Sequence, residues 1–346
     1  MRCLCPPLAV MEKNMNIVAT VNTNEKNFDE TVNKLISTDI NVLRFNLGKV
    51  EGNKKELDNF YKKIAYVRKI SKKYKILVDL PYPGKKYRVI LDKTCLDIKK
   101  EEIYYLSTND ETSIFLSKLK CEILHLNQTI NEEDMEGKII YVDLGQGAFK
   151  VLKYDQNYFV LQAMNDFILS NYDSLSFGFV PKVKYEEILE EVCKKCCPDM
   201  IALSFVESSN DLCIANTLKE KYGYELISKI ETNLGMNNIK EIISKSDSIM
   251  FGRGDLSLYS EPIKLIKFQT LASNICKEKK CRFYLATGIL TSISDYFIPL
   301  RSELIDLGYA LDLDPDYLVL NVKLVNSDGL ERALKLISSY AGFKKE

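Results

Sequence analysis

The stretch ELISKIETNLG, residues 225–235, opens as an apolar run of the kind that forms a buried strand. Lys229 and Glu231 interrupt that run two positions apart, so both side chains face the same side of the strand near its end. A buried ion pair rarely adds stability, because the loss of hydration offsets the attraction between the charges. We therefore expect this lysine and this glutamate to have a functional role.

Similar apolar runs recur along the chain, separated by segments with the spacing of amphipathic helices. Eight strands alternate with eight helices, which is typical of a (β/α)8 TIM barrel in the α/β class. The expected strands are residues 16–22, 41–48, 75–81, 200–206, 225–231, 248–256, 282–290 and 316–321.

One connection, after the third strand, is far longer than the others. Its hydrophobic period changes from 3.6 to 2, which predicts an inserted β-rich domain. The insertion leaves the barrel on the face where active sites lie, so it is expected to act as a lid that excludes water. The expected division is a tail at 1–15, a first barrel part at 16–87, the lid domain at 88–182 and a second barrel part at 183–346.

The composition excludes several classes of protein. The 346 residues carry 48 basic and 48 acidic side chains, so a general nucleic-acid or membrane binder is not expected. The N-terminal MRCLCPPLAV does not resemble a secretory signal, and no apolar run is long enough to cross a bilayer. We expect a cytoplasmic protein with reduced thiols, translated from Met1, Met11 or Met15.

The cysteines and the single histidine give little indication of a metal site or of a catalytic triad. The CKKCC segment, residues 193–197, contains a CxxC, but no second ligand pair of matching spacing exists. Its three cysteines, at positions 193, 196 and 197, share one face of the expected helix, which favours inward packing over metal binding. With only His125 in the chain, a histidine-based triad or a multi-histidine metal site is nearly excluded.

Polar side chains gather at the ends of the expected strands, where barrel enzymes carry their functional groups. The set comprises two cations, three carboxylates and two neutral polar groups, namely Arg44, Lys229, Asp79, Glu231, Asp255, Asn46 and Thr287.

Alternative roles exist for some members of this set. Arg44 could pair with Asp79 as scaffold or could bind substrate, and both readings stay open. Two carboxylates on neighbouring strand ends, Glu231 and Asp255, favour a hard cation such as Mg²⁺. Gly254, like the glycine two positions before it, leaves room for a ligand to approach backbone N–H groups.

Several longer motifs together resemble the pyruvate kinase family, in order over most of residues 16–312. They are NVLRFNLG at 41–48, IYVDLG at 140–145, SKIE at 228–231, FGRGDL at 251–256, LATGIL at 285–290 and PLRSELIDLGYAL at 299–311. The family's fold is a (β/α)8 barrel with a β lid inserted after the third strand, in agreement with the pattern above.

The resemblance implies roles at the phosphoryl group. Lys229 matches the lysine that stabilises the phosphoryl group in flight, and Arg44 matches the arginine that binds it. Glu231 and Asp255 match the ligands of the divalent metal, Mg²⁺ or Mn²⁺. Thr287 matches the threonine near the methylene carbon of the enolate.

The resemblance also implies sites for a monovalent cation and for the nucleotide. Asn46 and Asp79 match ligands of K⁺. Asp143 matches an aspartate of the lid near the nucleotide, and Arg88 matches the arginine at the lid hinge.

The sequence departs from the family around the monovalent cation. Gly48-Lys49 replaces the usual Ser-His, and Leu80-Pro81 replaces the usual Thr-Lys, so two of four expected ligands are missing. Lys85 or Lys86 could supply a positive charge in place of K⁺. The requirement for K⁺ therefore stays open.

The resemblance implies a phosphotransferase that moves phosphate between phosphoenolpyruvate and ADP, giving pyruvate and ATP in glycolysis. Two alternatives stay open: an aldolase or lyase that acts on an oxo acid through a metal enolate, and a non-catalytic protein that binds phosphoenolpyruvate. The chain ends after the eighth helix, without the family's C-terminal domain, so we expect a homodimer or a monomer.

Overall fold

The computed structural model describes residues 15–49, 54–80, 87–109, 112, 123–127, 129–130, 135–143, 145–155, 157–178 and 185–343. The segment with Lys85 and Lys86, which the sequence suggests as a source of positive charge, lies outside these residues.

A closed barrel of eight parallel strands forms the larger part of the molecule and confirms the predicted fold class. Its strands in chain order are β1 (Asn16–Val21), β2 (Val42–Asn46), β3 (Lys75–Leu80), β13 (Met200–Leu203), β14 (Glu225–Ile230), β15 (Ser248–Gly252), β16 (Arg282–Ala286) and β17 (Tyr317–Leu320). The barrel closes where β1 pairs with β17, with Val18 opposite Val319.

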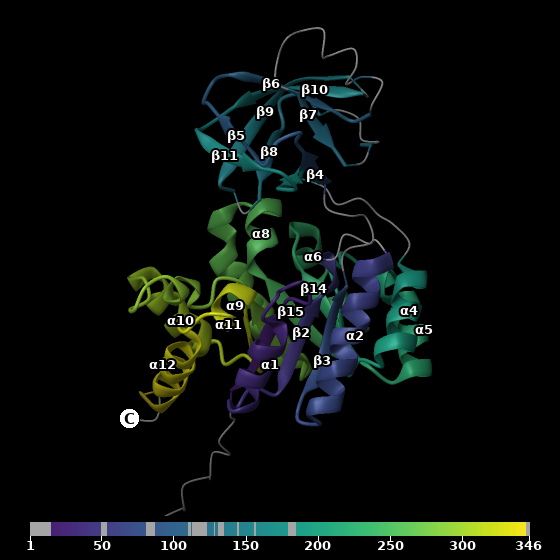
Figure 1. Ribbon diagram of the computed structural model, residues 1–346, viewed down its shortest axis with the longest axis vertical. Helices are drawn as coiled ribbons and strands as arrows, with labels where there is room; N and C mark the ends of the chain where they lie inside the picture. Colours follow the sequence, from purple (N-terminus) through teal and green to yellow (C-terminus); the bar gives the residue numbers. More distant parts are fainter. Residues whose placement is uncertain are drawn as a thin grey trace, which may run out of the picture.

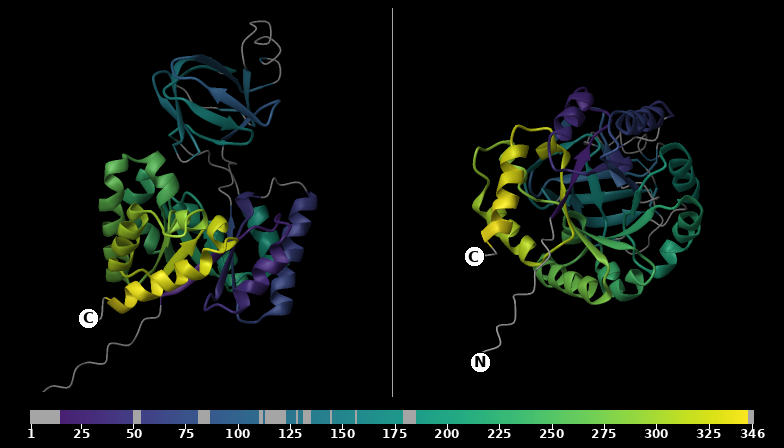
Figure 2. Two further views of the ribbon diagram at one scale, coloured as in Figure 1. Left: turned by 60° about the vertical axis from the view of Figure 1, so that its left-hand side comes forward. Right: turned by 90° about the horizontal axis from the view of Figure 1, so that it is seen from below.

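Helices surround these strands in a ring that is visible from below in Figure 2. The larger ones are α1 (Phe28–Ile36), α2 (Lys54–Ile70), α4 (Glu186–Cys196), α5 (Cys213–Tyr222), α9 (Leu265–Lys279), α10 (Arg301–Asp312) and α12 (Leu330–Phe343). Shorter elements are α6 (Asn233–Asn237), α7 (Ile239–Ile243), α8 (Arg253–Tyr259), α11 (Val322–Val325), η1 (Leu47–Lys49), η3 (Ser209–Leu212), η4 (Pro262–Lys264) and η5 (Thr291–Ser294). No helix in the described part of the chain combines the length and apolar content needed to span a membrane.

A second closed barrel follows β3 and lies above the first in Figure 1. It is built from β4 (Tyr87–Ile90), β6 (Ile103–Ser107), β7 (Ile123–Leu126), β8 (Ile139–Val142), β9 (Gly147–Asp155), β10 (Tyr158–Ala163) and β12 (Ser174–Ser176). A two-stranded sheet of β5 (Cys95–Ile98) and β11 (Phe167–Ser170) accompanies it. It has a separate apolar core, which includes Phe149 and Phe159.

The large barrel has two apolar layers, because alternate strand residues face opposite sides. Outward residues such as Leu226 and Ile230 of β14 pack against the helices. Inward residues such as Ile227 and Met250 fill the barrel axis. On β14 the inward series therefore continues from Ile227 to the two charged residues at the end of the strand.

The sixth strand of the barrel is shorter than the predicted 248–256. β15 ends at Gly252, and residues from Arg253 onward form α8. The prediction was wrong because the two glycines of FGRGDL give the segment no local preference strong enough to choose between strand and helix. Asp255 thus lies in the first turn of a helix rather than on a strand.

Helix α8 also touches the inserted domain. Tyr259, at the end of α8, forms a side-chain hydrogen bond with Ser176 of β12. A Cβ added to Gly145 would lie 3.5 Å from the Leu258 side chain. The same helix therefore carries Asp255 at the barrel rim and contacts the insertion. Figure 1 shows α8 between the large barrel and the inserted domain.

Candidate active site

The polar layer at the rim follows directly from the inward series of the strands. Lys229 comes two residues after Ile227 on β14, and Asp79 comes two residues after Leu77 on β3. Arg44 likewise follows Val42 on β2. These charged side chains therefore lie at one end of the barrel axis, above its apolar filling.

Lys229 is the centre of this layer. Its ammonium lies 3.1 Å from Glu231 Oε1 and 3.2 Å from Asp79 Oδ1. It also donates a hydrogen bond of 2.9 Å to Ser204 Oγ. The side chain is only 11% exposed, so these interactions form where water screens charge weakly.

Asp79 is shared between two cations. Arg44 Nε and Nη2 donate to its Oδ2 at 2.8 and 2.6 Å, while Lys229 approaches its other oxygen. Arg44 Nη1 donates to Thr20 Oγ1 of β1 at 2.9 Å. The ion pair between Arg44 and Asp79 that the scaffold interpretation expects is therefore present. Together with Thr20, it holds the arginine in a fixed orientation at the rim.

The charges of this network are mutually stabilised. Burial by itself raises the pKa of Asp79, but Lys229 and Arg44 outweigh it, and the pKa of Asp79 falls below its usual 3.8. Burial by itself lowers the pKa of Lys229, but Asp79, Glu231 and Asp255 outweigh burial and the repulsion of Arg44, so its pKa rises above 10.5. Both groups are charged at neutral pH.

Glu231 is held at a position that only a glycine neighbour allows. Its Oε2 accepts a hydrogen bond of 3.0 Å from the backbone N–H of Phe205. A Cβ at Gly252 would lie 2.7 Å from Glu231 Cγ and 2.9 Å from Oε1. The glycine that ends β15 therefore makes room for the glutamate of the neighbouring strand.

The donor set suits a hard divalent cation. Glu231 directly follows β14, and Asp255 lies in the first turn of α8. Within the described residues, no three acidic, histidine or cysteine side chains enclose a metal site by themselves. Mg²⁺ usually binds one or two carboxylates and completes its shell with water and substrate oxygens, so this pair fits it. Gly254 lies in the first turn of α8, and its carbonyl oxygen accepts a hydrogen bond of 2.7 Å from Ser257 Oγ.

Thr287 lies just beyond β16, with an exposed side chain and a φ of 75°. Its carbonyl accepts a hydrogen bond of 2.9 Å from Arg253 Nε. Arg253 is buried and also pairs with Asp306 of α10 at 2.6 Å. A threonine in the left-handed region is strained, and this buried arginine holds the backbone in place.

The remaining predicted site residues do not join the central network. Asn46 Oδ1 accepts from the N–H of Gly48 at 3.0 Å and so caps its own turn. Arg88 and Asp143 both lie in the inserted domain, where Arg88 Nη1 donates to the Tyr172 carbonyl at 2.7 Å. Their roles as cation and nucleotide ligands stay predictions.

Comparisons with known proteins agree with this geometry. The family model for "Pyruvate kinase, barrel domain" matches residues 12–322. The chain belongs to the pyruvate kinase family. It is 26% identical over 317 residues to the pyruvate kinase of Candida albicans, covering 86% of this chain and 60% of that protein. It is 26% identical over 349 residues to the Thermotoga maritima pyruvate kinase, covering 95% of this chain and 70% of that protein.

Over a shorter segment, the sequence identity to another relative is higher. The pyruvate kinase of Mycoplasma genitalium is 35% identical over 126 residues, which is 36% of this chain and 25% of that protein. The chain spans about 60% of the length of the Candida relative. Family membership therefore rests on the barrel, and the activity of the whole relatives is carried to this chain only as a proposal.

Two further polar residues at the barrel rim are not among those that the sequence indicates, namely Ser204 and Arg253. Ser204 stands directly after β13, where the strand-end rule applied to the fourth strand would have found it. Its hydroxyl accepts from Lys229 and donates to the Leu80 carbonyl at 2.9 Å. Arg253 follows a fully buried strand, but no local pattern shows that it turns toward Thr287.

The inward-packing interpretation of CKKCC is confirmed for two of its three cysteines and is wrong for Cys197. Cys193 and Cys196 are buried on α4, and burial raises the pKa of each thiol to about 12. Cys197 is exposed beyond the helix. His125 lies on β7 in the inserted domain, away from the barrel rim.

Proposed function

We propose that this barrel catalyses phosphoryl transfer between phosphoenolpyruvate and ADP, giving pyruvate and ATP. The observation that carries the proposal is the buried ammonium of Lys229, which lies 3.1 Å from Glu231 and 3.2 Å from Asp79 at the rim. A fixed cation beside a metal-ligating carboxylate is what a phosphoryl group with developing charge requires.

Each residue of the rim has a distinct part in this proposal. Lys229 offsets negative charge on the transferring phosphoryl oxygens, and Arg44, fixed by Asp79, binds the phosphate in the ground state. Glu231 and Asp255 would hold Mg²⁺ or Mn²⁺, which would neutralise phosphate and enolate oxygens when bound. Thr287, held by Arg253, would face the methylene carbon of the enolate.

The inserted domain would serve as a lid over this site. α8 carries Asp255 in its first turn and contacts the insertion through Tyr259. A metal ion held by Asp255 would therefore bind to the same helix that contacts the lid. Arg88 and Asp143 would meet the nucleotide there, and closure would exclude water from the transfer.

The proposal extends to the monovalent cation. Asp79, which resembles a K⁺ ligand of the family, already has Arg44 on one oxygen and Lys229 on the other. A further cation would meet a carboxylate whose charge is balanced. We therefore propose that the reaction proceeds without K⁺.

A second copy of this chain is the proposed partner. Large apolar side chains are exposed around the start of α9 and of α10, namely Ile263, Ile266, Tyr296, Phe297, Ile298, Leu300, Leu304 and Ile305. The two helices are neighbours, because Tyr309 of α10 donates to the Ile266 carbonyl of α9. At roughly 100 Å² for each side chain, this surface approaches the ~800 Å² that one partner contributes to a standard interface.

One experiment tests the central proposal. The purified chain is incubated with phosphoenolpyruvate, Mg²⁺ and each of several nucleoside diphosphates in the cytoplasmic pH range, and pyruvate and nucleoside triphosphate are both measured. Equal formation of the two products supports the phosphotransferase. Pyruvate with inorganic phosphate and no triphosphate shows transfer to water and contradicts the proposal. Cleavage of an oxo acid without any nucleotide identifies the lyase alternative. Binding of phosphoenolpyruvate without any product identifies the non-catalytic alternative.

A further inference from the structure

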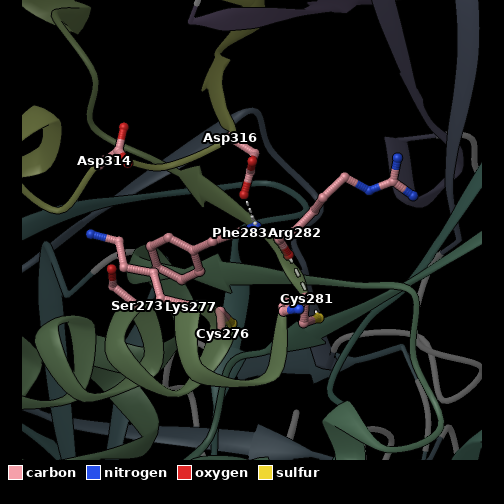
Figure 3. A pocket seen from close by; sticks show the side chains of 9 residues that line it. Ser273, Cys276, Lys277, Cys281, Arg282, Phe283, Asp314 and Asp316 are labelled. Atoms are coloured by element: carbon pink, nitrogen blue, oxygen red, sulfur yellow. Dashed lines mark hydrogen bonds between the residues drawn. The ribbon is translucent and has the colours of Figure 1, made fainter. Parts of the chain in front are cut away.

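A pocket lies at the opposite end of the barrel from the candidate active site. It has a volume of about 210 Å³ and is formed by the end of α9, the start of β16 and the loop before β17. Figure 3 shows Cys276 and Cys281 in its wall, with Lys277 and Arg282 nearby. The start of β16 and the end that carries Thr287 are separated by the full length of the strand.

The C-terminus of α9 brings two of these cysteines together. Lys280 adopts the left-handed conformation with φ of 55°, and the N–H of Cys281 donates to the Cys276 carbonyl at 2.9 Å. This is a Schellman motif, in which the side chains at the two ends of that hydrogen bond are in contact. Accordingly, the thiols of Cys276 and Cys281 share a hydrogen bond.

The two thiols are chemically unequal. Cys276 is fully buried, whereas Cys281 is partly exposed at the pocket. The hydrogen bond from Cys276 lowers the pKa of the Cys281 thiol, and Arg282 acts in the same direction, against burial, Asp247 and Asp316. The same hydrogen bond, together with burial, raises the pKa of Cys276. Cys281 is thus the accessible, more acidic thiol, and Cys276 is a thiol directly behind it.

The entrance of the pocket favours an anion. Lys277 and Lys280 have exposed side chains that line it, together with Arg282. Arg282 is paired with Glu225 at 2.9 Å, and Asp316 accepts from the N–H of Phe283 at 2.8 Å. The lining thus holds three basic side chains and two acidic ones, Asp314 and Asp316, and the two lysines are exposed to solvent.

We propose that Cys276 and Cys281 form a dithiol site that reacts with small anionic disulfides. The Cys281 thiolate attacks one sulfur of the disulfide, forms a mixed disulfide and releases one thiolate. The Cys276 thiol then attacks Cys281 Sγ, gives its proton to solvent, and releases the second thiolate. The two protein thiols are oxidised to one disulfide, and the small disulfide is reduced to two thiols. This inference does not depend on the proposed phosphoryl transfer.

The test uses the full chain and glutathione disulfide, followed by alkylation, trypsin digestion and mass spectrometry. Trypsin cleaves after Lys277, Lys279 and Lys280, so a Cys276–Cys281 bond joins two separate peptides until it is reduced. The proposal expects this bond in the wild type. It expects a persistent glutathione adduct at Cys281 in Cys276→Ser, and no adduct at position 276 in Cys281→Ser.

Two comparisons separate a built site from an ordinary exposed thiol. Cys213 is exposed on α5 and provides the internal reference for reaction rate. Lys277→Ala combined with Lys280→Ala is expected to slow the reaction with glutathione disulfide about threefold and to leave the reaction with the cationic disulfide cystamine unchanged or faster. Circular dichroism of each variant confirms that it is folded.

Three results would overturn the proposal. Cys281 could react no faster than Cys213, the adduct could persist in the wild type without transfer to Cys276, or the lysine variants could slow both disulfides equally. None of these measurements uses pyruvate formation, so their failure is distinguishable from failure of the proposed function.

Discussion

Lys229 Nζ lies 3.1 Å from Glu231 Oε1, with Lys229 near the end of β14 and Glu231 directly after it. Because Glu231 is also bound by the Phe205 N–H, the glutamate holds its position while the lysine is shared with Asp79. The rim therefore combines a phosphate-directed cation with a carboxylate for a metal, and the consequences can be measured.

Lys229→Met is expected to reduce pyruvate formation by at least about 10²–10³-fold, because an oriented charge at the reacting group is lost. It is also expected to destabilise the fold by about 3 kcal/mol, since Glu231 keeps a buried charge without its cation. Coupled assays and urea unfolding measure the two effects. Lys219→Met is the matched control, because Lys219 pairs with Asp247 at 2.6 Å but is about one-third exposed, and its loss should cost no more than about 1 kcal/mol. Wild-type turnover in the Lys229 variant would remove the main support for the proposed mechanism.

Gly252→Ala is expected to weaken Mn²⁺ binding about 10- to 100-fold, because the new Cβ would lie 2.7 Å from Glu231 Cγ and displace the carboxylate. The backbone at residue 252 has a φ of −90°, so alanine introduces no dihedral strain. Titration with Mn²⁺ alone measures the effect. Gly308→Ala, where the nearest atom is the flexible end of Tyr340 at 3.2 Å, should leave Mn²⁺ affinity unchanged. Equal affinities for both variants would show that Glu231 does not ligate the metal.

Replacing K⁺ by tetramethylammonium is expected to change pyruvate formation by less than about twofold, because Arg44 and Lys229 already balance the charge of Asp79. The measurement is the initial rate in each salt at constant ionic strength. A fall of about tenfold or more in tetramethylammonium would show that Asp79 ligates a monovalent cation after all.

The pH profile of kcat/KM is expected to show no break caused by ionisation of Lys229 or Asp79 between pH 3.8 and 10.5. The raised pKa of Lys229 keeps it charged until the pH exceeds 10.5, and the lowered pKa of Asp79 keeps it charged until the pH falls below 3.8. Their stabilising attraction is therefore present through the whole interval and is lost only outside it. A pH profile of kcat/KM with a break assigned to Lys229, through its absence in Lys229→Arg, would contradict this expectation.

Asp173→Asn is expected to stabilise the inserted domain by about 0.5 kcal/mol near neutral pH. Burial raises the pKa of Asp173, and the neighbouring Asp143 raises it further. A carboxyl with a raised folded-state pKa costs stability once the pH exceeds that pKa and costs nothing well below 3.8, so the advantage of asparagine should vanish in acid. Asparagine can still accept from the Ser170 N–H, which lies 2.7 Å away. Thermal unfolding as a function of pH measures the difference, and a pH-independent gain would contradict the like-charge explanation. The control is Asp166→Asn, because Asp166 of the same domain also accepts from a backbone N–H, that of Lys100 at 2.7 Å.

Phe297→Glu combined with Ile305→Glu is expected to convert a homodimer to a monomer, because the exposed apolar surface beside α10 would gain two charges. Light scattering after size exclusion measures the mass. Ile168→Glu changes an exposed isoleucine of the inserted domain and should leave the mass unchanged. A wild-type monomer at micromolar concentration would exclude this interface.

The sequence by itself determined the barrel and most of the residues at its rim. Apolar runs such as the one that contains Lys229 predict a strand, and the alternation of side chains along a strand predicts which residues share a face, because both are local properties of the chain. The roles of these residues followed from the resemblance to the family, not from spacing.

Only the tertiary structure decided which of these groups meet. Asp79 lies between Arg44 and Lys229 because strand order and register bring β2, β3 and β14 to one barrel axis, and the separations along the chain carry no such information. The start of α8 and the turn of Arg253 toward Thr287 were likewise decided by packing against β16, because a two-glycine segment has no local preference strong enough to choose between strand and helix.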